Sequence, residues 1–424
     1  MSQLMPADAG ALPASRTVEA PGRASRAAVA VGFVILALSY MINAMDRQVF
    51  FPLLPSIRAE YGFSLPAGGF LATGFTLGMA VAGLPAGFLL ARRSRKQVLI
   101  VSIVVYSLGT LATPLAVGYS DMMAYRLVSG LGEGMQSAAL FAAVGAYFFH
   151  RRALALGGIG AAFGLGTFFG PIIGIHLATS AHTWRAPLVL FGSCGLVIAM
   201  TAVFALTSKM TESVADPVRV TATYEHVPAN PYNRNTISLA VSAALAGLAV
   251  YGFLGLYPTY LIKHLHYGAG QAALAASFFG FGGLSAIAAG WLGDRVNQRN
   301  LLIAAYLGLA GTSLLVYQTH VGPNTQYLYA LLMGVFGSGA LYPNLMSSMQ
   351  RAVRPEKVGV AAGLFITSYY VTAAVSGLLF GWLADRIGWS GAGLWQVTVL
   401  AVLAAVALLA VRTSRFITAA GSSG

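Results

Sequence analysis

Twelve apolar stretches, each long enough to cross a lipid bilayer as an α-helix, dominate this sequence of 424 residues. Only 9% of the residues are charged, whereas soluble domains carry about 25%, so the chain cannot cover a water-facing surface of its size. We therefore predict an all-α membrane protein with twelve transmembrane helices. The expected helices span residues 29–52, 65–91, 97–117, 121–149, 153–177, 185–207, 236–262, 269–292, 300–318, 326–350, 358–384 and 393–411.

The distribution of Lys and Arg predicts the orientation of these helices. With the N-terminus in the cytoplasm, 19 of the 25 basic residues fall on the cytoplasmic side and 4 on the opposite side, while Arg47 and Arg126 lie inside helices. This bias is the one that the positive-inside rule describes. We expect a multi-pass protein of the cell (inner) membrane with both termini cytoplasmic. Because the net charge of +13 follows this topology, no nucleic-acid partner is expected.

Three segments are expected to lie outside the bilayer. Residues 1–28 have no apolar core and are predicted to form a disordered cytoplasmic tail, not a signal peptide. Residues 208–235 form the longest polar stretch, which predicts a cytoplasmic linker, and residues 412–424 form a C-terminal tail. The single cysteine, Cys194, excludes a disulfide framework and a thiolate metal site. We expect neither a cofactor nor a metal.

The sequence also repeats itself at an offset of 203 residues. This repeat predicts two pseudo-symmetric six-helix bundles, residues 29–207 and 236–411, on either side of the linker. Two packed halves with a site at their interface are a common way to build a carrier that works by alternating access. The aligned pairs are Pro55 with Pro258, Gly87 with Gly290, Arg92 with Arg295, and Arg151 with Arg354.

Four ionisable residues lie well inside the predicted helices: Asp46 and Arg47 in the first, and Arg126 and Glu133 in the fourth. Each costs about 2.5–3.5 kcal/mol at a helix centre, so such residues are candidates for function and are expected to face a water-filled cavity or one another. Gly130 and Gly134 would let a neighbouring helix approach the fourth helix closely.

The spacing of these four residues predicts how they pair. Asp46 and Arg47 are adjacent, so their side chains diverge by about 100° around the helix. We expect Asp46 to face Arg126 and Arg47 to offer its guanidinium to a carboxylate or phosphate in the cavity. Glu133 has no adjacent cation in sequence, and desolvation would favour its neutral form, so it is a candidate proton carrier. The alternative is that the Asp46–Arg126 pair only locks two helices together.

The whole chain resembles the major facilitator superfamily. The loop signature of that family, Gly-x-Leu-x-Asp-Arg-x-Gly-Arg-Lys between helices 2 and 3, corresponds here to GFLLARRSRK at residues 87–96, with Ala91 at the acidic position. A later copy, GWLGDR at residues 290–295, keeps the acid. The resemblance implies the two-bundle fold and a gating role for Gly87, Arg92, Asp294 and Arg295, although Ala91 removes the acid from the first charge-relay latch.

Two groups of that superfamily share further motifs with the chain. Three segments are similar to motifs of the anion:cation symporters, which carry organic anions, and of the spinster-like lipid carriers. They are NAMDR at residues 43–47, RLVSGLGEG at 126–134 and YPTYL at 257–261. The resemblance to the symporters implies that Asp46 and Glu133 couple protons, and that Arg47 and Arg126 bind the carboxylate of the substrate.

Polar and aromatic residues on other helices are candidates to line the cavity. In the family, parts of helices 7, 10 and 11 surround the cavity, which makes Tyr251, Tyr342, Asn344 and Tyr369 candidate substrate contacts. Gln136, close to Glu133 in the fourth helix, is a further candidate. Aromatic residues near helix ends more often anchor the membrane interface, and we expect this of Tyr260 and Tyr267.

These observations predict a secondary active transporter, a monomer that carries a small organic anion, such as a carboxylate, together with protons. A spinster-like lysolipid or amphiphile carrier, and an organic anion exchanger or exporter, remain as alternatives. The sequence has no repeated selectivity filter or arginine ladder of a channel and no phosphate-binding loop of an ATP-driven pump. It also contains no nucleophile–base constellation, so an enzyme is not expected.

Overall fold

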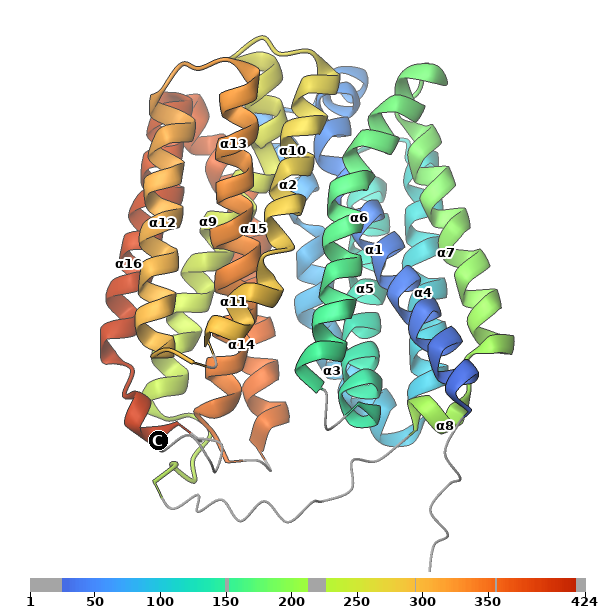
Figure 1. The fold of residues 1–424 in the computed structure, drawn as a ribbon. Coiled ribbons are helices and arrows are strands. Elements are labelled where there is room, and N and C mark those ends of the chain that lie inside the picture. The colour runs from blue at the N-terminus through green and yellow to red at the C-terminus, as the bar shows by residue number, and fades with distance from the viewer. Residues whose placement is uncertain (1–24, 149–151, 213–225, 294, 355–356, 417–424) are drawn as a thin grey trace, which may run out of the picture.

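The computed structural model describes residues 25–148, 152–212, 226–293, 295–354 and 357–416. These residues form helices in two bundles that stand side by side, with the first half of the chain in one bundle and the second half in the other (Figure 1). Most of the predicted N-terminal tail, the middle of the linker, Asp294 and the last eight residues lie outside the described parts of the chain.

The first bundle contains α1 to α8. Its second crossing is split at Gly74, and the other crossings are single long helices. Ser94 and Gln97 form a capping box that fixes the start of the third crossing. The helices are α1 (Arg26–Tyr61), α2 (Leu65–Thr73), α3 (Phe75–Arg92), α4 (Arg95–Ala112), α5 (Tyr119–Tyr147), α6 (Arg152–Ser180), α7 (Arg185–Ala205) and the short α8 (Ser208–Thr211).

The second bundle contains α9 to α16, and three of its crossings are interrupted. A turn separates α10 from α11, and π-helical segments lie at Val335–Leu341, between α13 and α14, and at Gly393–Val399, before α16. The helices are α9 (Arg234–Lys263), α10 (Ala269–Gly283), α11 (Ala286–Gly293), α12 (Gln298–Gln318), α13 (Pro323–Gly334), α14 (Tyr342–Arg351), α15 (Val358–Ala392) and α16 (Leu400–Ala407).

The described residues contain eleven helical stretches that are long and apolar enough to cross a bilayer. The last stretch, Gly363–Ala410, has 48 residues and would be about 72 Å long as one helix, more than twice the hydrocarbon thickness of about 30 Å. Gly388 interrupts it with a φ of 75° and a ψ of 171°, a backbone conformation that favours glycine. The stretch therefore makes two crossings, which gives the predicted total of twelve.

The first helix is longer than predicted. We expected it to end at residue 52, but it continues through Pro52 and Pro55 to Tyr61. Proline is tolerated in membrane helices where neighbouring helices satisfy the freed backbone groups. Gly62, with a φ of 70°, then ends α1 in a left-handed cap.

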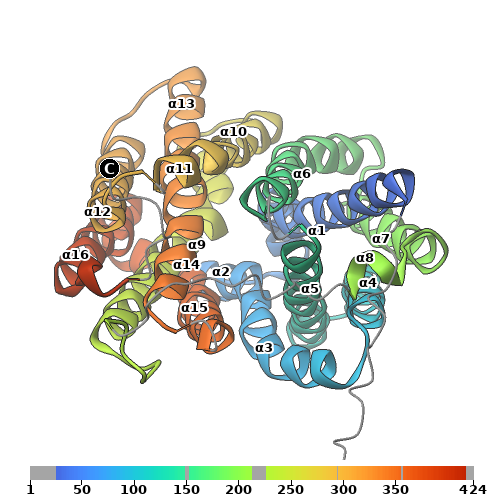
Figure 2. The ribbon, with the colours of Figure 1, turned by 60° about the horizontal axis from the view of Figure 1, so that its bottom comes forward.

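A tight seam joins the two bundles at the end away from the termini. The second half of α2 meets the middle of α15, where Gly69 and Gly377 are in backbone contact. Thr73 on α2 donates to the carbonyl oxygen of Ala374 (2.9 Å) and accepts from the backbone N–H of Gly377 (3.2 Å). Figure 2, turned so that the termini come forward, shows α3 and α15 beside each other across the boundary between the bundles. The halves are thus directly bonded to each other at the end opposite the termini.

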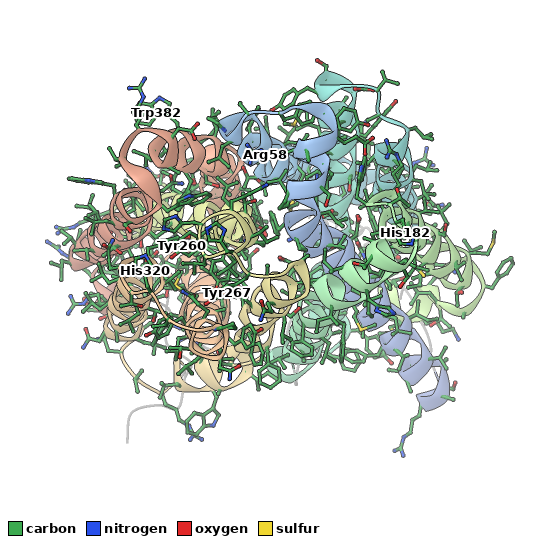
Figure 3. All side chains as sticks on the ribbon, turned by 90° about the horizontal axis from the view of Figure 1, so that it is seen from above. Arg58, His182, Tyr260, Tyr267, His320 and Trp382 are labelled. Atoms are coloured by element: carbon green, nitrogen blue, oxygen red, sulfur yellow. The ribbon has the colours of Figure 1, made fainter. Side chains whose placement is uncertain are left out.

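Tyr260 lies near this same end, which Figure 3 shows from above together with Arg58, Tyr267 and His320. We predicted an interfacial anchor at Tyr260, but its side chain is only 2% exposed. Its hydroxyl donates to the carbonyl oxygen of Val316 at 3.1 Å, and its ring packs inside the second bundle. The position near a helix end suggested an interface, whereas the neighbouring helices cover the ring.

We expect Gly377→Val to weaken the seam. A Cβ at residue 377 would overlap the carbonyl oxygen of Gly69, and overpacking of this kind costs about 1–3 kcal/mol, which shifts a two-state equilibrium by roughly 5- to 150-fold. Spin labels at Ala67→Cys and Ile387→Cys, in a Cys194→Ser background, should report a longer mean distance. Gly363→Val on the same helix, where a Cβ meets no atom within 4 Å, is the control and should leave that distance unchanged.

Candidate functional site

Arg47 on α1 and Glu133 on α5 form a buried ion pair between two helices of the first bundle. The Arg47 Nε donates to the Glu133 Oε2 at 2.8 Å, and the two side chains are 3% and 0% exposed. A second guanidinium nitrogen of Arg47 donates to the Asn43 Oδ1, one turn earlier on α1, at 3.1 Å. Glu133 has no adjacent cation in sequence, and the structure gives it Arg47 as a partner. The sequence could not predict this pair, because the two residues are 86 positions apart.

Asp46 turns away from Arg47, as the spacing predicted, but its expected pairing with Arg126 is wrong. The two side chains form no ion pair. The Asp46 Oδ2 instead accepts a hydrogen bond from the hydroxyl of Thr110 on α4, while its Oδ1 is buried without a partner. Asp46 therefore has one oxygen that is hydrogen-bonded to Thr110 and one oxygen without a hydrogen-bond partner.

Arg126 lies between aromatic rings. Its guanidinium carbon is 3.9 Å from the ring centre of Phe50 and 4.6 Å from that of Phe75, a cation–π arrangement. One of its terminal nitrogens donates to the carbonyl oxygen of Ala72 at 3.3 Å, and its Nε is buried without a partner. Gly130 makes this packing possible, because a Cβ there would overlap the carbonyl oxygen of Phe75 on α3. The predicted close helix approach at Gly130 is confirmed.

Two acids and two bases thus share one buried region with a formal charge of zero when all four are ionised. Each residue is at most 2% exposed, so Arg47 does not face the open cavity that we expected for it. Arg47 and Glu133 face one another instead, which is the other arrangement expected of charges inside a membrane. Burying a net charge is expensive, whereas a balanced set is tolerated where its members bond one another. Any change in the charge of one member therefore has to be matched by another charge. We call Asp46, Arg47, Arg126 and Glu133 the charge cluster.

Gln136 belongs to the same hydrogen-bond network. Its Oε1 accepts from the Asn43 Nδ2 at 2.9 Å, and its Nε2 donates to the Ser39 Oγ at 3.2 Å. Through Asn43, these amides hold the guanidinium of Arg47 in place. Sequence reasoning singled out Gln136 but missed the roles of Asn43 and Ser39, because buried polar residues of this kind are common in membrane helices.

The second bundle presents aromatic rings to this region. Phe75 bridges the halves, since its ring centre lies 5.8 Å from the Arg47 guanidinium carbon and 6.4 Å from the ring of Tyr251 on α9. Tyr251 lies 6.0 Å from Tyr369 and 6.1 Å from Tyr370, both on α15. Sequence reasoning selected Tyr251 and Tyr369, and the structure brings them together beside Arg47. Sequence reasoning missed Phe75, because its side chain has no polar group that would mark it as a site residue.

Tyr342 completes the aromatic group. It follows the π-helical segment directly, and its hydroxyl lies 3.1 Å from that of Tyr370. Asn344, two residues further, points elsewhere. Its Nδ2 donates to the carbonyl oxygens of Ala289 (3.3 Å) and Ala340 (2.9 Å). The structure therefore places Tyr342, but not Asn344, with the predicted lining residues. We call Tyr251, Tyr342, Tyr369 and Tyr370 the tyrosine group.

The predicted gating residues lie far from the charge cluster along their helices. Gly87 and Arg92 belong to the last turns of α3. Arg295 follows α11, and its guanidinium carbon lies 3.8 Å from the ring centre of Trp291. Asp294, the acid of the second copy, falls outside the described residues.

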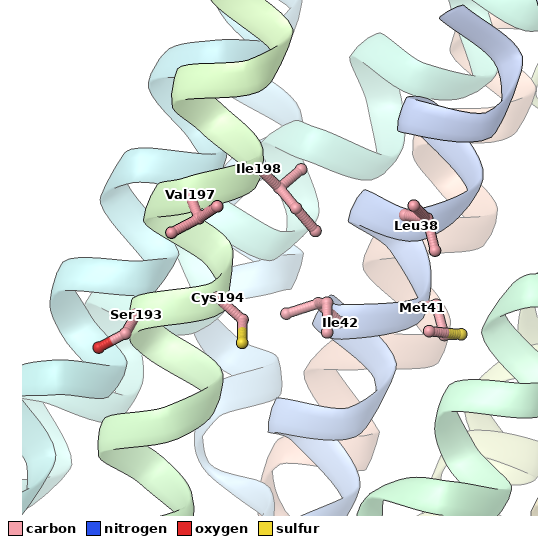
Figure 4. Close-up of a pocket in the computed structure, with 7 residues that line it drawn as sticks. All are labelled: Leu38, Met41, Ile42, Ser193, Cys194, Val197 and Ile198. Carbon is pink, nitrogen blue, oxygen red and sulfur yellow. The ribbon is translucent and has the colours of Figure 1, made fainter. Parts of the chain in front are cut away.

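A surface groove in the first bundle is separate from this site. This groove of about 290 Å³ lies between α1 and α7 and has an almost entirely apolar lining (Figure 4). Val197 in its wall is 65% exposed, as expected of a side chain that faces lipid. The groove includes no member of the charge cluster or the tyrosine group. Its lining residues are Leu38, Met41, Ile42, Ser193, Cys194, Val197 and Ile198.

Comparison with known families and proteins gives consistent results. The chain matches the Major Facilitator Superfamily over residues 36–377 and 239–422. It is 25% identical over 405 residues to the hexuronate transporter of Bacillus subtilis (strain 168), covering 89% of this chain and 93% of that protein. It is also 25% identical over 410 residues to the 4-hydroxybenzoate transporter PcaK of Pseudomonas aeruginosa, covering 88% and 90%.

Two solved structures share the fold at low identity. A D-xylose–proton symporter superposes with a TM-score of 0.73 at 15% identity, covering 91% of this chain and 98% of that one. A bacterial homologue of the human lysosomal transporter Spinster, in an inward-facing and occupied conformation, superposes with a TM-score of 0.70 at 15% identity, covering 91% and 96%. At these identities the likeness concerns the arrangement of helices alone.

Proposed function

The chain belongs to the major facilitator superfamily, and we propose that it is a symporter that carries a small organic anion, a carboxylate, together with a proton. The relatives that it resembles along most of their length include transporters named for hexuronate and for 4-hydroxybenzoate, both of which are carboxylates. The observation that carries the proposal is the charge cluster with its formal charge of zero.

Charge balance links the proton to the anion. One proton on Asp46 or Glu133 gives the buried cluster a charge of +1, and one monocarboxylate restores neutrality. Either ligand alone would leave a net charge inside the membrane, which is costly. The state that carries both ligands and the state that carries neither are therefore the ones in which the bundles move most readily. This alternation is what coupled transport requires.

Arg47 is the residue that we expect to bind the carboxylate. A guanidinium has five N–H groups, and Arg47 uses one for Glu133 and one for Asn43. Protonation of Glu133 weakens the ion pair and frees a further N–H, so that a carboxylate can take its place in a bidentate contact. Arg126 adds a second positive charge nearby, and Gln136 holds the network in place through Asn43.

The neighbouring rings favour an anion with a planar or aromatic body. Phe75 lies between Arg47 and Tyr251, and the hydroxyls of Tyr342 and Tyr370 offer hydrogen-bonding groups on the far side. A ring held among aromatic side chains with its carboxylate on Arg47 fits this arrangement. Sugar acids fit through the tyrosine hydroxyls and remain within the proposed class.

The burial of the site supports alternating access over a channel mechanism. Arg47 is 2% exposed, so an anion reaches it only after the bundles move apart. The seam at Gly69 and Gly377 closes the end opposite the termini. We propose that rocking of bundles 29–207 and 236–411 about this region opens the two sides in turn, in a monomer of the inner membrane with both termini cytoplasmic.

Uptake into liposomes tests this function. We expect the purified chain to accumulate radiolabelled 4-hydroxybenzoate or glucuronate when the lumen is made alkaline, and to lose accumulation when a protonophore removes the gradient. Lysophosphatidylcholine serves as the contrasting probe. Gradient-independent exchange of the acids would instead identify an exchanger, and movement of the lysolipid without the acids would identify a spinster-like carrier.

A further inference from the structure

Two hydroxyl groups lie between the acids of the charge cluster. The Thr110 hydroxyl on α4 donates to the Asp46 Oδ2 at 2.5 Å and lies 3.4 Å from the Ser129 hydroxyl on α5. Ser129 in turn donates to the Glu133 Oε1 at 3.3 Å. All four side chains are buried. An unbroken row of oxygen atoms therefore connects the carboxyl groups of α1 and α5.

The partners of these hydroxyls are unusual for the helices that carry them. Buried Ser and Thr in a helix commonly donate to the carbonyl oxygen four residues earlier. Ser102 and Thr113 on the same stretch of chain do so, bonding Val98 and Gly109. Thr110 and Ser129 donate to carboxylates instead. Their hydroxyls are thus directed into the row and not back to the backbone.

A count of hydrogen atoms shows what the row lacks. It contains three oxygen–oxygen contacts, namely Asp46 with Thr110, Thr110 with Ser129, and Ser129 with Glu133. When both acids are ionised, the two hydroxyls supply only two hydrogens, and both are used on the carboxylates. Thr110 and Ser129 then face each other without a hydrogen between them. One added proton gives three hydrogens for three contacts.

We propose that Thr110 and Ser129 relay a single proton between Glu133 and Asp46. A proton on the Glu133 Oε1 passes to the Ser129 oxygen, whose own hydrogen passes to the Thr110 oxygen, whose own hydrogen passes to the Asp46 Oδ2. Each hydroxyl gains one hydrogen and loses one, so one proton moves from acid to acid and no charge is left on the way. The reverse shift is equally balanced.

The relay rests on the proposed proton coupling and adds a switch to it. With the proton on Glu133, Arg47 is released for an anion. With the proton on Asp46, Glu133 is ionised again and recaptures Arg47, which displaces the anion. The position of one proton along the row thus determines whether Arg47 is paired with Glu133 or free to bind an anion. The other ionisable side chains that face the two acids are Arg47, Arg126, Tyr40, Tyr106 and Tyr251.

Proton counting on the purified full chain tests the relay without any substrate. Proton uptake on acidification is compared between the unmodified chain and an Asp46→Asn/Glu133→Gln variant, and the difference should be one proton. Thr110→Val leaves a buried carboxylate without its donor, so Asp46 should take a proton of its own and the difference should rise to two. Thr110→Ser keeps the hydroxyl and should restore one.

Transport of 4-hydroxybenzoate in liposomes provides the second readout. Thr110→Val and Ser129→Ala should each lower proton-driven uptake by about tenfold or more. Ser102→Ala, which removes a buried hydroxyl bonded only to its own helix, is the control and should change neither measurement.

Two results would overturn the relay. One is an uptake of two protons by Asp46 and Glu133 in the unmodified chain. The other is proton uptake and transport by Thr110→Val and Ser129→Ala that match those of Ser102→Ala. Either result leaves the proposed symport standing. Absence of proton-driven uptake in the unmodified chain would instead remove the proposed function, while the proton count still tests the relay.

Discussion

Arg47→Gln is expected to abolish uptake of the organic anion and also to destabilise the fold. The change removes the group proposed to bind the carboxylate, which should weaken binding by about 2–5 kcal/mol, a loss of about 30-fold or more. It also leaves Glu133, which is completely buried, without its cation. Breaking a buried pair in this way costs about 3–5 kcal/mol of folding free energy. Uptake in liposomes and the thermal unfolding midpoint measure the two effects.

A double variant separates the two effects of this change. Arg47→Gln combined with Glu133→Gln removes both charges of this pair together and leaves neither residue as an unpaired ion, so the unfolding midpoint should recover most of its loss. Uptake and binding of 4-hydroxybenzoate should remain absent, because no guanidinium is present at that position. If the double variant regains binding, Arg47 serves only to hold α1 against α5, and the anion binds elsewhere.

The fold could be predicted almost completely from the sequence. Twelve crossings, the two bundles and their pseudo-symmetry follow from hydropathy, the placement of basic residues and the repeat at 203 residues, because the bilayer permits few other arrangements. The exceptions are local. The extension of α1 to Tyr61 and the burial of Tyr260 depend on which helices lie next to them. Neighbouring helices are a tertiary property that a linear pattern does not contain.

The members of the site could be predicted, but their partners could not. The sequence identified Asp46, Arg47, Arg126 and Glu133 because charged residues are rare inside the predicted helices and each costs free energy in a membrane. The pairing of Arg47 with Glu133 depends on the rotation of α1 against α5, which the spacing within one helix does not determine. Arg126 finds aromatic rings where an acid was expected, because cation–π contacts with Phe50 and Phe75 stabilise its charge. Thr110 and Ser129 carry no distinguishing sequence signal.

Glu133→Gln is expected to uncouple transport from the proton gradient while preserving exchange. Glutamine has nearly the shape of a protonated glutamate, and it can still accept the hydrogen bond from Arg47. While Asp46 is ionised, the cluster then carries a charge of +1 without a bound proton, and one monocarboxylate neutralises it. The loaded carrier can therefore cross, whereas the empty carrier holds an uncompensated charge and returns slowly.

Two assays on the same liposomes measure this separation. Accumulation of 4-hydroxybenzoate against its own gradient, driven by an alkaline lumen, should fall to the level of liposomes that lack the protein. Counterflow, in which labelled acid exchanges for unlabelled acid inside, should continue, and its rate should lose its dependence on pH. Glu133→Asp, which keeps a titratable group on a shorter side chain, is the matched control and should retain part of the accumulation. Full proton-driven accumulation by Glu133→Gln would place the coupling proton on Asp46 alone, because the remaining acid would then suffice without its partner.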